Sequence, residues 1–472
     1  MVFKTKLVLF FIKSFLLIIL FSNNIICSDD KKDVIFVLEV FSNGITSSET
    51  NESNQDVLGE FWLKDENLTN MGIRQQYLLG INDKNTYQNF LIDETFNPKD
   101  ILIKSLNRSE NIQSAYSHLH GIYNPPNGQK LNNSFDTSII FPNYNNLNQS
   151  EQGKIDDMVD KIKNDSAVLS GVTIVPVHIF DFDLNDKEKC PNYFQLKKNN
   201  IEKNKEKFKN IIFNKFNETF GDLFLQAFNK DESFFQNPEN LMLYLNTFII
   251  DYITKRKIKS LENKNLNLKY LYDTAKDLIQ KYTLNIEFDY DYNQNENLIS
   301  TIKSSPILKS LFYYADLRID YDSNGKRYKK DSKRPKFVLF SVGKDELNAL
   351  QKKLNETFNI ELNDMNAFSS SINFEVFKKN NESNEDNDYE INIIYNGDSK
   401  KNISYDDFKN NFTNLWDEDK IKKFCKEKDV DKYLKQNKFN MNIILLFWSI
   451  SAIILVFLYF SNRFYINYSN RD

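Results

Sequence analysis

The stretch from Val34 to Phe41, near the start of the chain, is an apolar run of strand length that is rich in β-branched and aromatic residues. Such a run predicts a strand that is buried on both faces, and strands of this kind are typical of parallel sheets covered by helices. Gly44 indicates a turn just beyond the run. We therefore expect a central parallel strand that ends in a tight turn.

Later segments alternate between strand and helix patterns. Apolar runs or strict alternation predict strands at residues 101–103, 171–180, 336–342, 370–380 and 389–398. Helical spacing appears at residues 68–80, 111–119 and 345–354. Pro176 places its strand at a sheet edge or a strand end, and Gly80 is expected to end its helix. The order of these patterns predicts an α/β fold.

Residues 194–285 show no strand pattern, and their apolar residues recur at helical spacing. We predict that this stretch is a helical cap inserted into the α/β core. The core then comprises residues 28–193 and 286–430.

Both ends of the chain contain apolar segments. Residues 1–27 have the pattern of a secretory signal peptide, with early lysines, an apolar run and then polar residues. Residues 441–460 form an uncharged apolar run of the length that crosses a bilayer as a helix. We expect a single-pass type I membrane protein of the secretory pathway, a lysosome-like compartment or the cell surface, with a lumenal or extracellular body and a cytoplasmic tail at 461–472. The alternatives are an uncleaved anchor at 1–27 and a buried core helix at 441–460.

Composition excludes one class of partner and fits a secreted body. The formal net charge of -4 provides no basic face for nucleic acid. Cys190 and Cys425 are the cysteines that remain once the signal peptide is removed, and an even pair in a secreted body suggests one disulfide. Acceptor sequences for N-glycosylation occur at Asn51, Asn67, Asn107, Asn132, Asn148, Asn164, Asn217, Asn355, Asn381, Asn402 and Asn411.

Five short segments resemble motifs of the histidine acid phosphatase family, and they follow the family's order. They are "LTNMGIRQQYLLG" (68–80), "SAYSHLHGIYNP" (114–125), "VPVHI" (175–179), "CPNY" (190–193) and the hairpin "SINFEVF" with "IIYNG" (371–397). The resemblance implies a phosphoglycerate-mutase-like core sheet with flanking helices and a helical cap, and it implies that Cys190 pairs with Cys425. It also implies phosphomonoester hydrolysis without a cofactor, in which a histidine attacks phosphorus, arginines bind the phosphoryl oxygens and an acid protonates the leaving alcohol.

The family's first motif, RHGxRxP, aligns with this sequence at Gly44. Ser42 and Asn43 then occupy the positions of the first arginine and the histidine, and Thr46 and Ser48 occupy those of the second arginine and the proline. The amide nitrogen of asparagine has its lone pair delocalised into the carbonyl, so it cannot form the phospho-enzyme that an imidazole forms. The implied nucleophile is therefore missing.

The second motif, RSTDVxRT, aligns with "KSLNRSEN" at residues 104–111. Lys104 stands for the phosphate-binding arginine and keeps its charge, but it lacks the planar fork that matches a phosphate. Glu110 stands for the second arginine, and Arg108 falls one frame away from any arginine of the family.

The third motif, SAHDxxL, aligns with the segment from Ser341 to Leu347. Gly343 replaces the second histidine, and Lys344 replaces the aspartate that donates the proton. A register shifted by one residue would make Asp345 the acid.

The chain contains three histidines, His118, His120 and His178, and none follows a strand that ends in a glycine turn. We interpret them as packed or surface residues. We predict no metal site, because nothing in the sequence places His178 beside the other two and the lumenal cysteines are expected to pair.

We interpret the chain as a degenerate member of this family, a pseudophosphatase with a binding or structural role. Lys104 and Lys344 are its candidates for binding a phosphate or another anion. One alternative is an active acid phosphatase with displaced catalytic residues, such as Asp345. Another is a binding protein that uses the cap, residues 194–285, as its recognition surface.

Overall fold

The computed structural model describes residues 33–47, 67–88, 92, 95–125, 128, 144–161, 171–180, 184, 188–228, 230–254, 267–288, 298–324, 334–360, 362, 368–379 and 389–426. The predicted signal peptide (1–27), membrane helix (441–460) and cytoplasmic tail (461–472) lie outside these residues. Among the helices that the structure describes, none combines the length and the apolar character required to cross a membrane.

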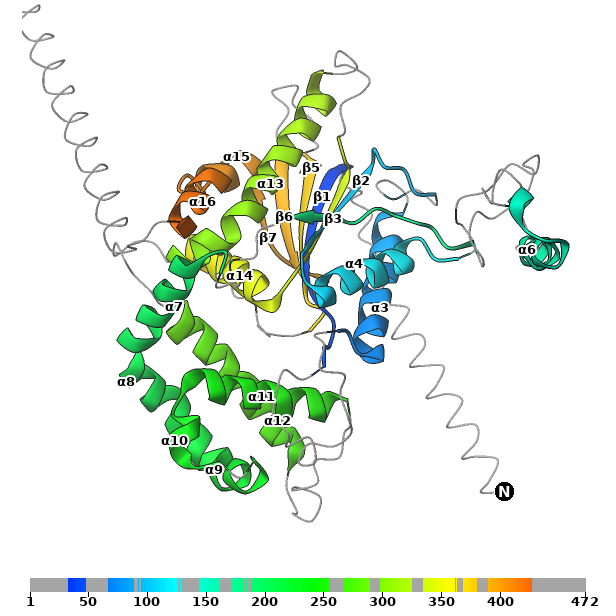
Figure 1. Cartoon of the computed structure of the whole chain (residues 1–472). Coiled ribbons are helices and arrows are strands. Elements are labelled where there is room, and N and C mark those ends of the chain that lie inside the picture. Colours follow the sequence, from blue (N-terminus) through cyan, green and yellow to red (C-terminus); the bar gives the residue numbers. More distant parts are fainter. Residues whose placement is uncertain are drawn as a thin grey trace, which may run out of the picture.

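The described part of the chain is built around a seven-stranded mixed sheet in the order β3-β2-β4-β1-β5-β6-β7 (Figure 1). The strands are β1 (Asp33–Ser42), β2 (Ile101–Leu106), β3 (His178–Phe180), β4 (Phe337–Val342), β5 (Ser371–Lys378), β6 (Tyr389–Tyr395) and β7 (Asp398–Ser404). Strands β1 to β4 run parallel to one another, and β5, β6 and β7 continue the sheet in antiparallel fashion. The predicted central strand is confirmed as β1, and the strand after Pro176 is confirmed at an edge.

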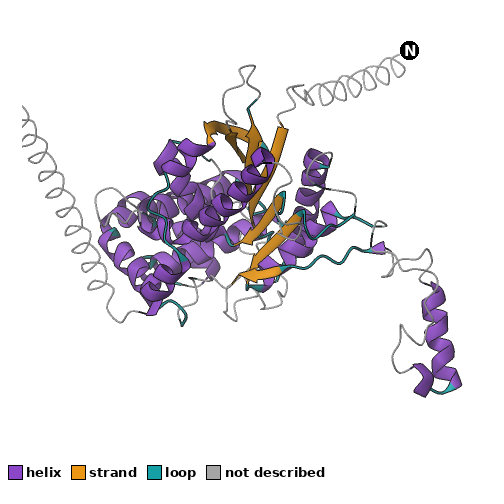
Figure 2. Ribbon diagram, turned by 90° about the horizontal axis from the view of Figure 1, so that it is seen from above, coloured by secondary structure: helices purple, strands orange, loops and turns teal. Residues whose placement is uncertain are grey.

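Strand β1 is buried on both faces, and its side chains alternate between two cores. Phe36, Leu38 and Val40 pack with α13 (Leu298–Asn324), α14 (Lys344–Phe358) and α15 (Tyr405–Asn410). Val37 and Phe41 pack on the other side with α3 (Asn70–Tyr87) and α4 (Ser109–Ile122). Helices therefore cover both faces of the sheet (Figure 2), which explains why the sequence of β1 reads as an apolar run.

Helix α3 begins where the sequence predicts. The side-chain oxygen of Thr69 accepts a hydrogen bond from the Gly72 amide at 3.0 Å, which caps the helix. The prediction that Gly80 ends this helix is wrong, because α3 continues to Tyr87. Gly80 instead faces α4, where a Cβ atom would overlap the backbone carbonyl of His118. The close approach of the two helices requires a glycine at this position. Glycine also marks the end of many helices, which is why the sequence pattern suggests a helix end here.

The described residues between 191 and 287 are almost entirely helical (Figure 1). The elements are α7 (Pro191–Lys203), α8 (Lys205–Lys207), η3 (Phe208–Phe213), α9 (Asn214–Phe228), α10 (Glu232–Phe235), α11 (Pro238–Ile253), α12 (Leu268–Tyr282) and η4 (Thr283–Glu287). Their aromatic and aliphatic residues form a hydrophobic core of their own, separate from the two cores at the sheet. Amphipathic helices can bury their apolar faces in this way without any strand.

The remaining described elements are η1 (Tyr144–Asn146), α6 (Gln149–Lys161) and α16 (Glu418–Lys426). A disulfide joins Cys190, directly before α7, to Cys425 in α16. This is the pair that the family resemblance implies, and it ties the helical region to the last described helix.

We predict that Gly80→Ala destabilises the protein by about 2 kcal/mol, because α3 and α4 must move apart to admit the methyl group. The matched control is Gly153→Ala in α6, where a Cβ atom would meet nothing within 4 Å. There the better helix propensity of alanine should stabilise the helix, by up to about 1 kcal/mol. Denaturant unfolding measures both, and equal effects of the two substitutions would contradict the account.

Candidate functional site

The three segments that align with the catalytic motifs meet at the end of the sheet where the parallel strands have their carboxyl ends. Strands β1, β2 and β4 are parallel, so their carboxyl ends, Ser42, Leu106 and Val342, lie at the same edge. The amide of Asn43 donates a hydrogen bond to the carbonyl of Val342 at 3.2 Å, which joins the first and third segments directly. Ligands of open α/β sheets bind at this edge, so it is the candidate site.

At the end of β1, Ser42 and Asn43 hold a neighbouring turn in place. The Ser42 hydroxyl accepts a hydrogen bond from the Ser370 amide at 3.1 Å, and the Asn43 carbonyl accepts one from the Ser369 amide at 3.0 Å. The Asn43 side chain donates to the Gly44 carbonyl at 3.0 Å and is buried. Thr46 lies in an antiparallel bridge with Leu68. These contacts give the first segment a structural role.

Gly44 also has a structural reason to be a glycine. A Cβ atom at this position would overlap the backbone of Gly72 in the first turn of α3. The Gly44 amide donates a hydrogen bond to the hydroxyl of Ser114 in α4 at 3.2 Å. Close packing of α3 against the turn is therefore sufficient to require this glycine, whether or not a phosphate binds there.

In the third segment, an ion pair occupies the space beside Gly343. A Cβ atom at Gly343 would lie 2.6 Å from Oε2 of Glu346 and 2.8 Å from a guanidinium nitrogen of Arg108. Arg108 and Glu346 themselves pair at 3.6 Å. The structure thus brings Arg108 to the site, although the sequence alignment placed it one frame away from any arginine of the family.

A buried lysine extends this ion pair. Nζ of Lys303, which is 1% exposed, lies 3.2 Å from Glu346 and 3.4 Å from Asp345. Burial lowers the pKa of Lys303, but the two carboxylates raise it by more, so that the pKa lies above its usual value. The lysine therefore remains charged, and carboxylates of the protein balance its charge.

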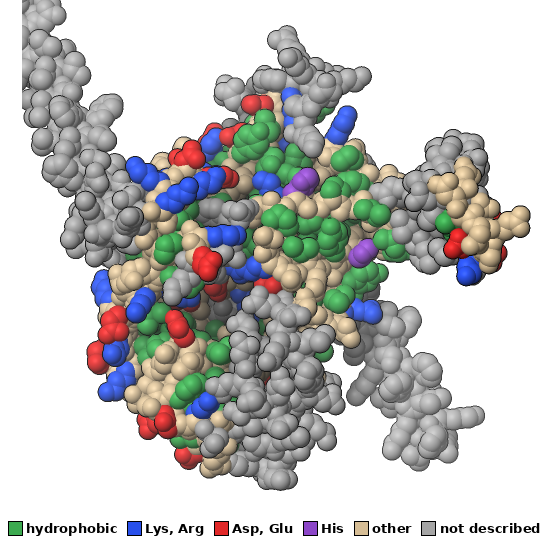
Figure 3. Space-filling view, viewed as in Figure 1, with side chains coloured by type: hydrophobic (Ala, Val, Ile, Leu, Met, Phe, Trp, Pro, Cys, Tyr) green, Lys and Arg blue, Asp and Glu red, His purple; other side chains and the backbone are tan. Residues whose placement is uncertain are grey.

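Asp345, the alternative acid, belongs to the same network. Burial raises its pKa, while Lys303, Lys197 and Arg108 lower it by more, so that the pKa falls below its usual range. Its position in the first turn of α14 also favours the ionised form. On the face seen in Figure 3, basic and acidic side chains lie among one another and form no large patch of one sign.

Lys104 and Lys344, the predicted anion-binding residues, have aromatic neighbours. Lys104 in β2 lies 5.4 Å from the ring centroids of Tyr314 and Phe340, and burial lowers its pKa, while the charge of Glu418 partly offsets this. Nζ of Lys344 lies 3.1 Å from the ring centroid of Phe368. Both arrangements are cation–π contacts, and anion binding by these lysines stays a prediction.

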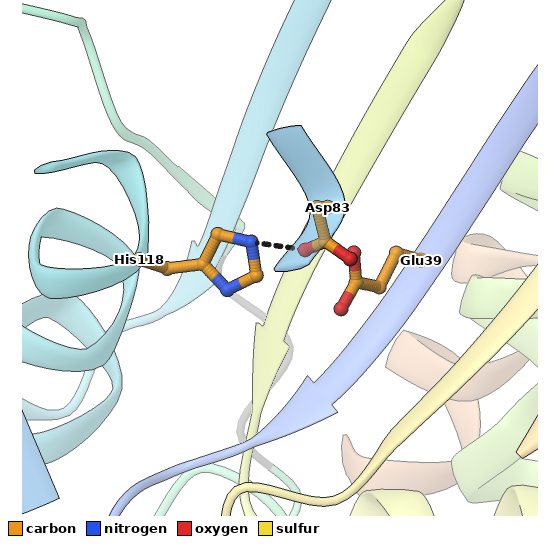
Figure 4. A group of neighbouring side chains, drawn as sticks. All are labelled: Glu39, Asp83 and His118. Atoms are coloured by element: carbon orange, nitrogen blue, oxygen red, sulfur yellow. Dashed lines mark ion pairs between the residues drawn. The ribbon is translucent and has the colours of Figure 1, made fainter. Parts of the chain in front are cut away.

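A second group of ionisable side chains lies on the face of the sheet that α3 and α4 cover, between these helices and β1 (Figure 4). Glu39, Asp83 and His118 are at most 2% exposed, and Nε2 of His118 lies 2.7 Å from Oδ2 of Asp83. Burial raises the pKa of Glu39 well above its usual value, and the charge of Asp83 raises it further. The ring of His118 stacks on Phe41 at 4.5 Å between centroids, as expected for a packed histidine.

The sequence does not predict this group of three side chains. Its one signal is Glu39, a charged residue within an otherwise apolar strand. Asp83 and His118 come from two other elements, so their proximity depends on the close crossing of α3 and α4 at Gly80. His120 is partly buried on α4, and His178 is exposed on β3, so the three histidines do not come together.

The described residues form a mixed α/β fold with a seven-stranded sheet and helices on both faces. No protein-family model matches the chain. Solved structures that it resembles include a Klebsiella phytase, with 12% identity, coverage of 77% of this chain and 83% of that chain, and a TM-score of 0.45. A phytase from D. castellii has 10% identity, coverage of 81% and 79%, and a TM-score of 0.46. The Bifidobacterium longum multiple inositol polyphosphate phosphatase, in complex with inositol hexasulfate, has 12% identity, coverage of 79% and 88%, and a TM-score of 0.43.

We predict that Glu346→Gln lowers the free energy of unfolding by about 3 kcal/mol, because it removes the closest carboxylate from the buried Lys303. The same substitution at Glu418, which forms an exposed pair with Lys422, should cost no more than about 0.5 kcal/mol. Denaturant unfolding of both variants provides the comparison. A small effect at Glu346, similar to that at Glu418, would show that the network does not hold the site together.

Proposed function

We propose that the chain is a catalytically inactive relative of the histidine acid phosphatases, a glycosylated pseudophosphatase anchored in a membrane through residues 441–460. Its body lies on the lumenal or extracellular side, and its role is binding or structural. The observation that carries the proposal is Asn43, a buried amide at the position where the family resemblance puts the nucleophilic histidine.

The chemistry of Asn43 supports inactivity. An amide nitrogen has no free lone pair with which to attack phosphorus, and loss of a nucleophile commonly costs on the order of a millionfold in turnover. The neighbouring residue, Ser42, directs its hydroxyl to the backbone of Ser370. Neither side chain supplies a group that could replace an imidazole.

The charge balance of the site supports the same conclusion. A phosphatase needs cations that are available to phosphoryl oxygens. In this chain the carboxylate of Glu346 lies between Arg108 and Lys303 and pairs with both. A phosphate would compete with this carboxylate for both cations, which makes Arg108 and Lys303 less available to phosphoryl oxygens.

The alternative is an active acid phosphatase with displaced catalytic groups, in which Asp345 is the acid. A general acid must carry a proton at the working pH. The cations around Asp345 lower its pKa and keep it ionised, which opposes that role. We therefore favour a catalytically inactive protein over an active acid phosphatase.

The proposal is tested with purified full-length protein and p-nitrophenyl phosphate at acidic pH. We expect no turnover above that of the buffer, and no difference between the wild type and the variants Asn43→Ala and Lys104→Ala. Lys422→Ala, at an exposed lysine, is the control. Turnover that is lost in Asn43→Ala or Lys104→Ala but retained in Lys422→Ala would contradict the proposal.

A further inference from the structure

A cavity of about 530 Å³ lies between α3 and the strands β5 and β6. Its lining includes Asn82, Asp83 and Tyr87 from α3, and Ser371 and Asn373 from β5. The lining found among the described residues contains no lysine, arginine or histidine. Asp83 is also the middle member of the buried group in Figure 4, so the cavity lining and that group share this residue.

Asn373 in the cavity lining and Glu39 beside it on the sheet carry buried oxygen atoms to which no N–H or alcohol group of the described residues donates a hydrogen bond, and Glu39 faces the carboxylate of Asp83 instead. These atoms are both carboxylate oxygens of Glu39 and Oδ1 of Asn373. All three atoms are buried, although the Asn373 residue as a whole is 7% exposed. Glu39 and Asn373 are paired directly across β1 and β5, so they lie on the same face of the sheet. Buried acceptors without donors are costly, and a cation would satisfy them.

The three side chains in Figure 4 form a mixed nitrogen and oxygen ligand set. His118 and Glu39 point toward Asp83 from opposite sides, and one donor atom of each residue lies within 4.8 Å of the other two. With both carboxylates ionised and the imidazole neutral, the group carries two negative charges, which a divalent cation balances. Imidazole with carboxylates suits Zn²⁺ and Mn²⁺, whereas Mg²⁺ and Ca²⁺ prefer oxygen ligands alone.

We propose that Glu39, Asp83 and His118 bind one divalent transition-metal ion of the Zn²⁺ or Mn²⁺ class, with a coordination position open toward the cavity. The 2.7 Å between His118 and Asp83 is the length of a hydrogen bond. Two ligands of a tetrahedral zinc lie roughly 3.4 Å apart, given bonds of about 2.1 Å. Binding therefore separates these two atoms by about 0.7 Å, and the imidazole proton moves from Nε2 to Nδ1 so that the neutral ring binds the ion through Nε2. A proton that Glu39 holds passes to solvent as its carboxylate binds.

The sequence predicts no metal site, because its histidines and cysteines do not form a ligand set on their own. The proposed site is different, because it also uses carboxylates. The ligand set here contains one histidine and two carboxylates from three separate elements. The ion would join β1, α3 and α4 at the place where the two helices cross. The proposal is independent of the pseudophosphatase proposal, because none of the three residues lies at the carboxyl edge of the sheet.

The test uses tag-free, full-length protein. Its metal content is measured by mass spectrometry as purified, and after treatment with a chelator its melting temperature is measured with Zn²⁺, Mn²⁺, Co²⁺, Mg²⁺ or Ca²⁺ alone. We expect about one transition-metal ion per chain, and a rise in melting temperature of about 3 °C at a hundredfold excess over Kd. Glu39→Gln and Asp83→Asn should abolish both, and His120→Gln, on the same helix as His118, should abolish neither.

Two results would overturn the proposal. The first is wild-type protein that holds no stoichiometric metal and melts at the same temperature with every ion. The second is a metal-dependent shift that persists in both Glu39→Gln and Asp83→Asn, since the ion would then lie elsewhere. The wild-type measurement does not depend on any variant, and Glu39→Gln keeps the shape of a protonated glutamate if another variant fails to fold.

Discussion

The burial of β1 on both faces is the constraint on which the rest of the structure depends. The strand lies between β4 and β5, so helices must cover it from two sides and its side chains must serve two cores. Its carboxyl end fixes the turn at Ser42 to Gly44, against which the first turn of α3 packs. Glu39, the charged residue within its apolar run, meets α3 and α4 on the opposite face from α13. Both the candidate site and the proposed metal site are therefore built on the same strand.

The glycine at position 44 and the residues that surround it are explained by separate physical causes. Gly44 is required by the close approach of Gly72, a packing demand that exists without any substrate. The catalytic positions carry no such demand, and in this chain Asn43 is used to hold the neighbouring turn. The space beside Gly343 is taken by the pair between Arg108 and Glu346. Packing alone therefore explains the glycine at position 44, while an internal ion pair fills the space beside Gly343.

The sequence predicts those features that depend on local patterns. The apolar run identifies β1, the helical spacing that begins at residue 68 identifies α3, and the family resemblance implies the disulfide between Cys190 and Cys425. Each of these follows from a period or a motif. They account for the central part of the fold and for the meeting of the three motif segments at one edge.

Features that depend on side chains from distant segments could not be predicted. Lys303 lies in the second turn of the long helix α13, and nothing in the neighbouring sequence marks it as the partner of Glu346. The side chain of Arg108 points toward Glu346, and a sequence alignment contains no information about where a side chain points. Gly80 has the pattern of a helix stop because glycine occurs both at helix ends and at close helix crossings. In each case the deciding quantity is a tertiary distance.

The proposal of an inactive phosphatase relative depends most on Asn43, whose amide cannot accept a phosphoryl group at the position where the resemblance puts a histidine. The most direct measurement is the intact mass of the full-length protein after it is mixed with a phosphomonoester at acidic pH and quenched rapidly. The account predicts an unmodified mass at every mixing time. A transient covalent phosphate adduct that maps to the candidate site would contradict it.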